Sequence, residues 1–154
     1  MKYMLLARPS ALIVNDMKRL VTKAGLEPKP LTSTDQFGEF DESEVGGIVI
    51  STALSSKVNE KYWEVIEKTR NHFPDKPIFL ASFSTVESTK LTAGNRLREH
   101  GIDLELKSIE EAQRDILAQK QILILTQKEI SDMGKLPLIT KLIKSIMVER
   151  KIFS

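Results

Sequence analysis

The pattern of apolar and polar positions is clearest between residues 46 and 82. An apolar run, Ile48-Val49-Ile50, follows two glycines without polar alternation, which is typical of a strand buried on both faces of a parallel sheet. Apolar residues then recur at helical spacing from Val58 to Phe73, with charged residues mostly around the other side. A second apolar run, Ile78-Phe79-Leu80, follows Pro77. The pattern predicts a strand, a crossover helix and a parallel strand, which together form a βαβ unit.

The rest of the chain extends this alternation in both directions. Strands are expected at 3–7, 26–32 and 102–106, and helices at 11–24, at 87–99 and from 108 onward. Pro28 and Pro30 cannot donate ladder hydrogen bonds, so the strand that contains them is expected at a sheet edge. Residues 33–45 are polar and allow only a short helix. Five strands alternating with five helices predict a three-layer α/β sandwich around a mostly parallel sheet.

The run Ile122-Leu123-Ile124-Leu125 fits two structures. It can continue the preceding helix, or it can form a sixth strand. We favour the helix, because no turn residue stands immediately on either side of the run. Gly134 and Pro137 then break the chain, and apolar residues between 138 and 147 trace a short amphipathic helix.

Composition restricts the classes of function. The 154 residues fit one domain, and the absence of cysteine excludes disulfides, thiolate metal sites and a cysteine nucleophile. No apolar stretch reaches the roughly 20 residues of a membrane span, so a cytoplasmic location is the default expectation. The sequence has no dinucleotide fingerprint, P-loop or G-x-S-x-G motif, and we expect neither a cofactor nor a metal. His72 and His100 are interpreted as helix-end residues, and Trp63 as a partly buried core residue.

Positive charge is concentrated at the C-terminal end. Residues 135–154 hold five lysines and arginines against one acid, Glu149, although the whole chain carries only +2. Such a segment could contact nucleic acid, an acidic membrane or an acidic partner. A solvated helix face that carries lysines for solubility is the plainer interpretation.

Two phrases of the sequence resemble the receiver domains of bacterial two-component response regulators. YWEVIEKTRNHFPDKPIFLAS looks like the third helix and fourth strand of a receiver, and EHGIDLELKS looks like the fifth strand with its terminal lysine. The resemblance covers residues 1–120 and implies a flavodoxin-like, five-stranded parallel sheet in the order 2-1-3-4-5. Residues 121–154 are then expected to form a helical extension that packs on this domain or on a partner.

The resemblance also implies a site at the carboxyl ends of the strands. Receivers bind Mg²⁺ with two acids after the first strand and accept phosphate on an aspartate after the third. Here Ala7 and Arg8 align with the acid pair, and Ser51 aligns with the phosphate acceptor. Ser82 fits the hydroxyl position after the fourth strand, and Lys107 fits the lysine after the fifth. The hydroxyl and lysine positions of receivers are therefore kept, whereas each of their carboxylates is replaced.

This replacement predicts a loss of phosphoryl transfer. Mg²⁺ needs oxygen ligands, usually including carboxylates, and Arg8 brings a positive charge instead. Ser51 lacks an adjacent base or metal to activate its hydroxyl. Arg8, Ser51, Ser82 and Lys107 therefore form either a vestigial pocket or a small anion site.

Receivers commonly contact partners through the fourth helix, fifth strand and fifth helix. The resemblance places the corresponding interaction face at six positions: Leu91, Leu97, Glu105, Ile109, Ala112 and Ile116.

We expect a non-phosphorylatable receiver-like domain, not an enzyme, that acts as a protein-interaction and regulatory module in bacterial signal transduction. Its partners would be signalling proteins or a second copy of the chain. One alternative is a small-anion or metabolite-binding protein, including an enzyme, that uses Arg8 and Lys107. Another is nucleic-acid association through the basic helix of residues 135–154.

Overall fold

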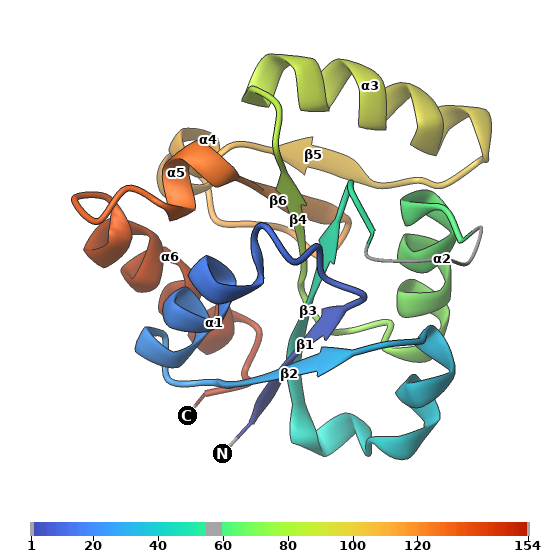
Figure 1. Ribbon diagram of the computed structural model, residues 1–154, viewed down its shortest axis with the longest axis horizontal. Helices are drawn as coiled ribbons and strands as arrows, with labels where there is room; N and C mark the ends of the chain where they lie inside the picture. The colour runs from blue at the N-terminus through green and yellow to red at the C-terminus, as the bar shows by residue number, and fades with distance from the viewer. Residues whose placement is uncertain (1, 55–59, 154) are drawn as a thin grey trace.

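A computed structural model describes residues 2–54 and 60–153, which form a three-layer α/β/α sandwich (Figure 1). The strands are β1 (Tyr3–Ala7), β2 (Glu27–Leu31), β3 (Val45–Ser51), β4 (Ile78–Ser82), β5 (Glu105–Lys107) and β6 (Gln121–Thr126). The helices are α1 (Val14–Lys23), α2 (Tyr62–His72), α3 (Val86–Glu99), α4 (Ile109–Arg114), α5 (Gln127–Ile130) and α6 (Leu136–Glu149). Two short 3₁₀ helices, η1 (Thr34–Glu39) and η2 (Glu42–Glu44), connect β2 to β3.

The sheet confirms the predicted fold class and corrects its strand count. All neighbouring strands are parallel, and β2 lies at an edge as its prolines predict. The sheet has six strands in the order β2-β1-β3-β4-β6-β5, so the predicted five-stranded order 2-1-3-4-5 is wrong. The sixth strand lies between β4 and the strand predicted to be its neighbour.

That extra strand is the run Ile122–Leu125, for which the helical prediction is wrong. β6 pairs with β4 through Phe79↔Leu123 and with β5 through Leu106↔Ile122. The four apolar residues are fully buried, as expected for a strand covered on both faces. The predicted long helix from residue 108 instead ends at Arg114 as the six-residue α4.

The predicted C-terminal extension therefore contributes to the sheet itself. Residues 121–126 are β6, so a boundary at residue 120 would cut between strands of one sheet. Helix α6 then buries its apolar side in the same core as α1, including Ile139, Ile143 and Ile146.

Helices cover the two faces of the sheet unequally. The first face lies under α1, α4, α5 and α6, and its core includes Met4, Leu6, Phe79, Leu123 and Ile143 (Figure 1). The second face lies under α2 and α3, with η1 alongside, and its core includes Leu5, Ile50, Ile66, Leu80 and Ile124. Successive strand residues alternate between the two cores, which follows from the period-2 geometry of a strand.

Glycines allow a close approach at the start of β3. A Cβ atom on Gly46 would lie 2.5 Å from a Leu26 methyl group. A Cβ atom on Gly47 would lie 3.1 Å from the Pro77 carbonyl oxygen and 3.1 Å from the Met4 sulfur. These contacts explain the Gly-Gly pair that precedes the buried run.

Val58, expected to begin the apolar face of the crossover helix, lies outside the described residues.

Candidate functional site

Three of the four residues expected at the site lie together at the carboxyl ends of the strands. Arg8 directly follows β1, Ser51 ends β3 and Ser82 ends β4, and these three strands are neighbours. Lys107 ends β5, whose partner in the sheet is β6. Because β6 lies between β4 and β5, Lys107 is one strand farther from Ser82 than the five-stranded alignment implied.

Arg8 is a buried cation that is held by a carboxylate. Its side chain is 3% exposed, and its guanidinium lies 2.6 Å from Glu60. The other Glu60 oxygen accepts hydrogen bonds from Lys68 at 2.7 Å and from Thr34 at 3.0 Å. Burial acts to raise the pKa of Glu60, but the hydrogen bonds from Lys68, Arg8 and Thr34 together hold that pKa below its ordinary value. We call Arg8, Glu60, Lys68 and Thr34 the Arg8 network.

The backbone at Arg8 adopts an uncommon conformation. Its φ angle is 50°, in the left-handed region that non-glycine residues seldom enter. The Arg8 amide nitrogen donates to the Leu31 carbonyl at 3.1 Å, which continues the pairing of β1 with β2 by one residue. Such conformations persist where surrounding contacts stabilise them, and here these contacts include the ion pair to Glu60.

The two serines use their hydroxyl groups locally. The Ser51 hydroxyl accepts from the Ala53 amide and donates to the Ala53 carbonyl, both at 3.1 Å. The Ser82 hydroxyl lies 2.7 Å from the Thr89 hydroxyl, which itself donates to the Thr85 carbonyl at 2.8 Å. Ser82 is therefore the donor to Thr89, and it also accepts from an amide of the next loop.

Beside Ser82 is a cavity of about 230 Å³ whose walls carry hydroxyl groups. They belong to Thr52, Tyr62, Ser82, Ser84, Ser88, Thr89 and Thr92. No charged side chain belongs to this lining among the described residues.

Sequence reasoning missed Thr126, the residue that pairs with Ser82 on the neighbouring strand. Thr126 ends β6 and pairs with Ser82, so it occupies the place that the resemblance gave to Lys107. The Thr126 hydroxyl donates to Glu129 at 2.8 Å, and Glu129 is only 8% exposed. Thr126 and Glu129 form a capping box for α5, and the Thr-x-x-Glu spacing is the sequence signal that could have revealed it.

Lys107 belongs to a separate surface cluster of charges. Its ammonium lies 2.6 Å from Glu105 and 3.9 Å from Glu111. The hydrogen bond to Glu105 raises the pKa of Lys107 above its ordinary value. The Glu111 carboxylate also pairs with Lys90, and this contact, with the Ser108 amide, lowers the pKa of Glu111 to about 2. Lys107 is thus neutralised by carboxylates on its own side of β6.

The six residues of the expected interaction face do not share one surface. Leu97, on α3, is buried in the core of the second face, whereas Ile109 and Ala112 are buried on the opposite face of the sheet. Leu91, Glu105 and Ile116 are exposed, with Leu91 65% and Ile116 45% accessible.

The remaining residues singled out by sequence lie in ordinary structural positions. His100 caps the C-terminus of α3 and stacks on the half-buried Trp63, with the ring centres 5.2 Å apart. His72 is the last residue of α2 and contacts Phe73. Within residues 2–54 and 60–153, no three histidines or acids lie close enough together to hold a metal ion. No helix in the described part of the chain is long and apolar enough to cross a membrane.

Comparisons with known proteins identify the fold. No family model matches the sequence, and no curated protein matches it. The CheY-like receiver domain protein of Methanospirillum hungatei JF-1 aligns over 98% of this chain and 97% of its own, with a TM-score of 0.58 and 12% identity. A receiver domain protein from Clostridium thermocellum aligns over 99% and 98%, with a TM-score of 0.56 and 11% identity.

A receiver protein from Sinorhizobium medicae WSM419 gives the same result, with a TM-score of 0.53 and 16% identity over 97% of this chain and 96% of that one. Identities this low establish a common fold rather than a common activity. The resemblance drawn from sequence is therefore supported at the level of architecture: the chain has the fold of response regulator receiver domains.

Proposed function

We propose that this chain is a receiver-like regulatory module of signal transduction that does not accept a phosphoryl group and acts through protein contacts. The observation that carries this proposal is the Arg8 network. A buried arginine stands where the resemblance places a metal-binding acid, and Glu60 is bound to two cations.

The network opposes metal binding for electrostatic reasons. Mg²⁺ requires oxygen ligands, and Glu60 could serve only if it left both Arg8 and Lys68. Arg8 would then lose the carboxylate that pairs with its buried charge, and loss of one partner from a buried ion pair costs roughly 3–5 kcal/mol. Its positive charge would also repel the ion.

The acceptor position lacks the chemistry of phosphorylation. Ser51, which is 2% exposed, replaces the aspartate, and its hydroxyl is engaged with the Ala53 backbone. The sequence from 52 to 59 contains no acid that could take over the role. A serine hydroxyl needs an adjacent base or metal for activation, and the described neighbours supply a backbone amide and carbonyl instead.

The network also supports a single signalling state. It links the end of β1, the start of η1 and the segment before α2 through charge-assisted hydrogen bonds. These contacts form without a phosphoryl group or Mg²⁺. A module of this kind would change state only when a partner has different affinities for two conformations.

The test is phosphorylation by acetyl phosphate with Mg²⁺, followed by intact mass measurement. A phosphorylatable receiver domain treated in parallel serves as the positive control. We expect an unchanged mass for this chain, and unchanged amide NMR spectra on addition of Mg²⁺ and beryllofluoride. Stoichiometric phosphorylation, or saturable shifts at Ser51 and Ser82, would overturn the proposal.

The protein-contact role is testable at the exposed part of the expected face. Ile116 is exposed beside Leu138 in a groove of about 490 Å³ between α4 and α6, with Arg114 and Lys141 also in its lining. If this groove joins two copies of the chain, sedimentation will show a dimer that Ile116→Asp abolishes and Leu12→Asp does not. Leu12 is a matched control, because it is 76% exposed in the turn before α1.

A further inference from the structure

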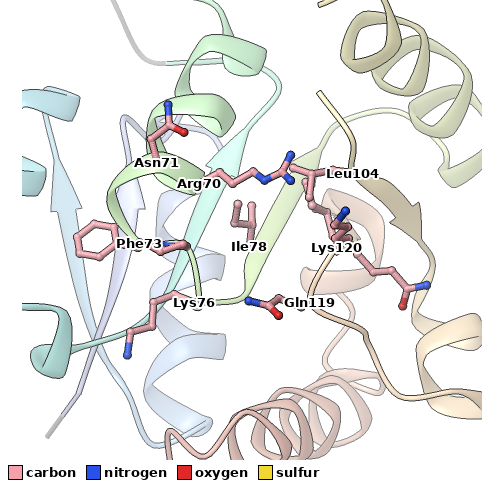
Figure 2. A pocket seen from close by; sticks show the side chains of 11 residues that line it. Arg70, Asn71, Phe73, Lys76, Ile78, Leu104, Gln119 and Lys120 are labelled. Atoms are coloured by element: carbon pink, nitrogen blue, oxygen red, sulfur yellow. The ribbon is translucent and has the colours of Figure 1, made fainter. Parts of the chain in front are cut away.

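A pocket of about 310 Å³ lies at the amino ends of β4 and β6, at the end of the sheet opposite to Arg8 (Figure 2). Three basic residues line it: Arg70 from α2, Lys76 from the loop before β4 and Lys120 from the loop before β6. No carboxylate belongs to this lining among the described residues. We propose that this pocket binds a small anion that carries a phosphate or carboxylate group on an apolar body.

Arg70 is the central cation of the pocket. Figure 2 shows its side chain extending from α2 across the pocket toward Leu104 and Lys120. In the described part of the chain, no acid lies within ion-pair distance of the Arg70 guanidinium, whereas Arg8, Arg19 and Arg96 each have one. A guanidinium suits phosphate or carboxylate because its fork of donors can bind two oxygens at once.

Of the two lysines, Lys120 can add charge to the same ligand, whereas Lys76 acts on it only at longer range. Lys120 pairs with Asp103 at 3.0 Å, but both side chains are more than two-thirds exposed, so the pair is weak and exchangeable. Lys76 is half-buried, and its ammonium points away from Arg70 in Figure 2. Burial first, and then repulsion by Lys2, lowers the pKa of Lys76.

The uncharged lining residues determine what kind of ligand body fits the pocket. Gln119 donates to Asp75 at 2.9 Å and thereby joins the loop before β6 to the loop before β4. Pro74 and Leu104 also line the pocket, and their side chains are accessible. An apolar body could cover these side chains while its anionic group meets Arg70, which is the mixed lining expected of small-molecule sites.

The pocket is independent of the Arg8 network. It lies at the amino ends of the strands, whereas Arg8, Ser51 and Ser82 lie at the carboxyl ends. Ligand binding here could therefore be present or absent whatever the outcome of the phosphorylation experiment.

The test is titration with three probes at constant ionic strength: phenyl phosphate, benzoate and inorganic phosphate. Isothermal calorimetry gives affinity, and amide NMR gives location. We expect saturable binding of phenyl phosphate or benzoate, tighter than that of inorganic phosphate, with shifts confined to residues 70–78, 103–105 and 118–122. The two organic probes distinguish a phosphate ligand from a carboxylate ligand.

Variants separate binding from a helix-end role of Arg70. Arg70→Gln should weaken binding at least about tenfold, as expected for the loss of a charge-assisted contact. Lys120→Gln, at an exposed site, should weaken it less, and Lys23→Gln, in the last turn of α1, should leave it unchanged. If Arg70 only stabilises the end of α2, its variant will lower the melting temperature without changing affinity, and the proposal fails. Shifts spread over all surface lysines, or no saturable binding, would overturn it equally.

Discussion

Replacing Glu60 by glutamine should destabilise the protein by an amount that follows from the Arg8 network. The substitution leaves Arg8, 3% exposed, without its carboxylate. Loss of one partner from a buried ion pair costs about 3–5 kcal/mol. Arg8 keeps other interactions and the glutamine amide oxygen can still accept one hydrogen bond, so we expect about 2–3 kcal/mol. The 52%-exposed Lys68 adds little.

Urea unfolding and thermal denaturation measure this loss. For a chain of this length, about 2–3 kcal/mol corresponds to a fall in Tm of roughly 5–10 °C. Glu67→Gln is the matched control, because Glu67 lies exposed on α2, the helix that follows Glu60. An effect of Glu60→Gln no larger than that of the control would refute the reasoning.

The pH dependence gives a second, independent check on Glu60. Its pKa in the folded state lies below the ordinary value of 4.5, so its carboxylate stabilises the fold fully above that value. This contribution is lost as pH falls from 4.5 through the folded-state pKa. The difference in stability between wild type and Glu60→Gln should therefore shrink in acid. A difference that stays constant from about pH 7 to about pH 3 would contradict the assignment.

Three further outcomes are expected. An NMR titration should find the pKa of Glu111 near 2, and Lys90→Ala should raise it toward 4.5, because Lys90 is the main cause of its depression. Gly47→Ala should destabilise by about 1–3 kcal/mol through overpacking, whereas Gly38→Ala, which meets nothing within 4 Å, should not; equal effects would contradict the packing account. A fragment of residues 1–120 should lack a cooperative unfolding transition, because it has no β6; a sharp transition would show that β6 is dispensable.

The sequence was most informative where a short run of residues predicts its own burial or its position in the sheet. Ile48–Ile50 and Ile78–Leu80 are buried on both faces, as their lack of polar alternation predicts. Pro28 and Pro30 correctly place β2 at the edge of the sheet. In each case the property read from the sequence is local, and the packing agrees with it.

β6 was missed because its boundaries depend on side chains rather than on glycine or proline. The Gln121 side chain accepts from the Ala118 amide at 2.8 Å and stabilises the turn before the strand. Thr126 and Glu129 cap the helix after it. Side-chain hydrogen bonds of these polar residues thus add to the backbone bonds at both ends of β6, where glycine and proline are absent.

The positions of the candidate residues follow from the sequence, whereas their contacts do not, and their role as a site stays a prediction. The ends of the strands brought Arg8, Ser51 and Ser82 to one edge, as the alternation of strands and helices implies. Glu60 was not singled out, because it lies 52 residues from Arg8 and no motif links the two. Lys107 was displaced because the insertion of β6 changed the neighbour of β4.

The place of β6 in the sheet has a consequence for biosynthesis. During translation, the residues of β4 and β5 leave the ribosome before those of β6, although both strands must pair with it. Until then, β4 presents an unpaired apolar edge, which is a template for wrong association. The nascent chain therefore cannot complete its sheet in the order in which it is made. We expect the sheet to be completed only after β6 has emerged, in contrast to a receiver whose strands are added one after another.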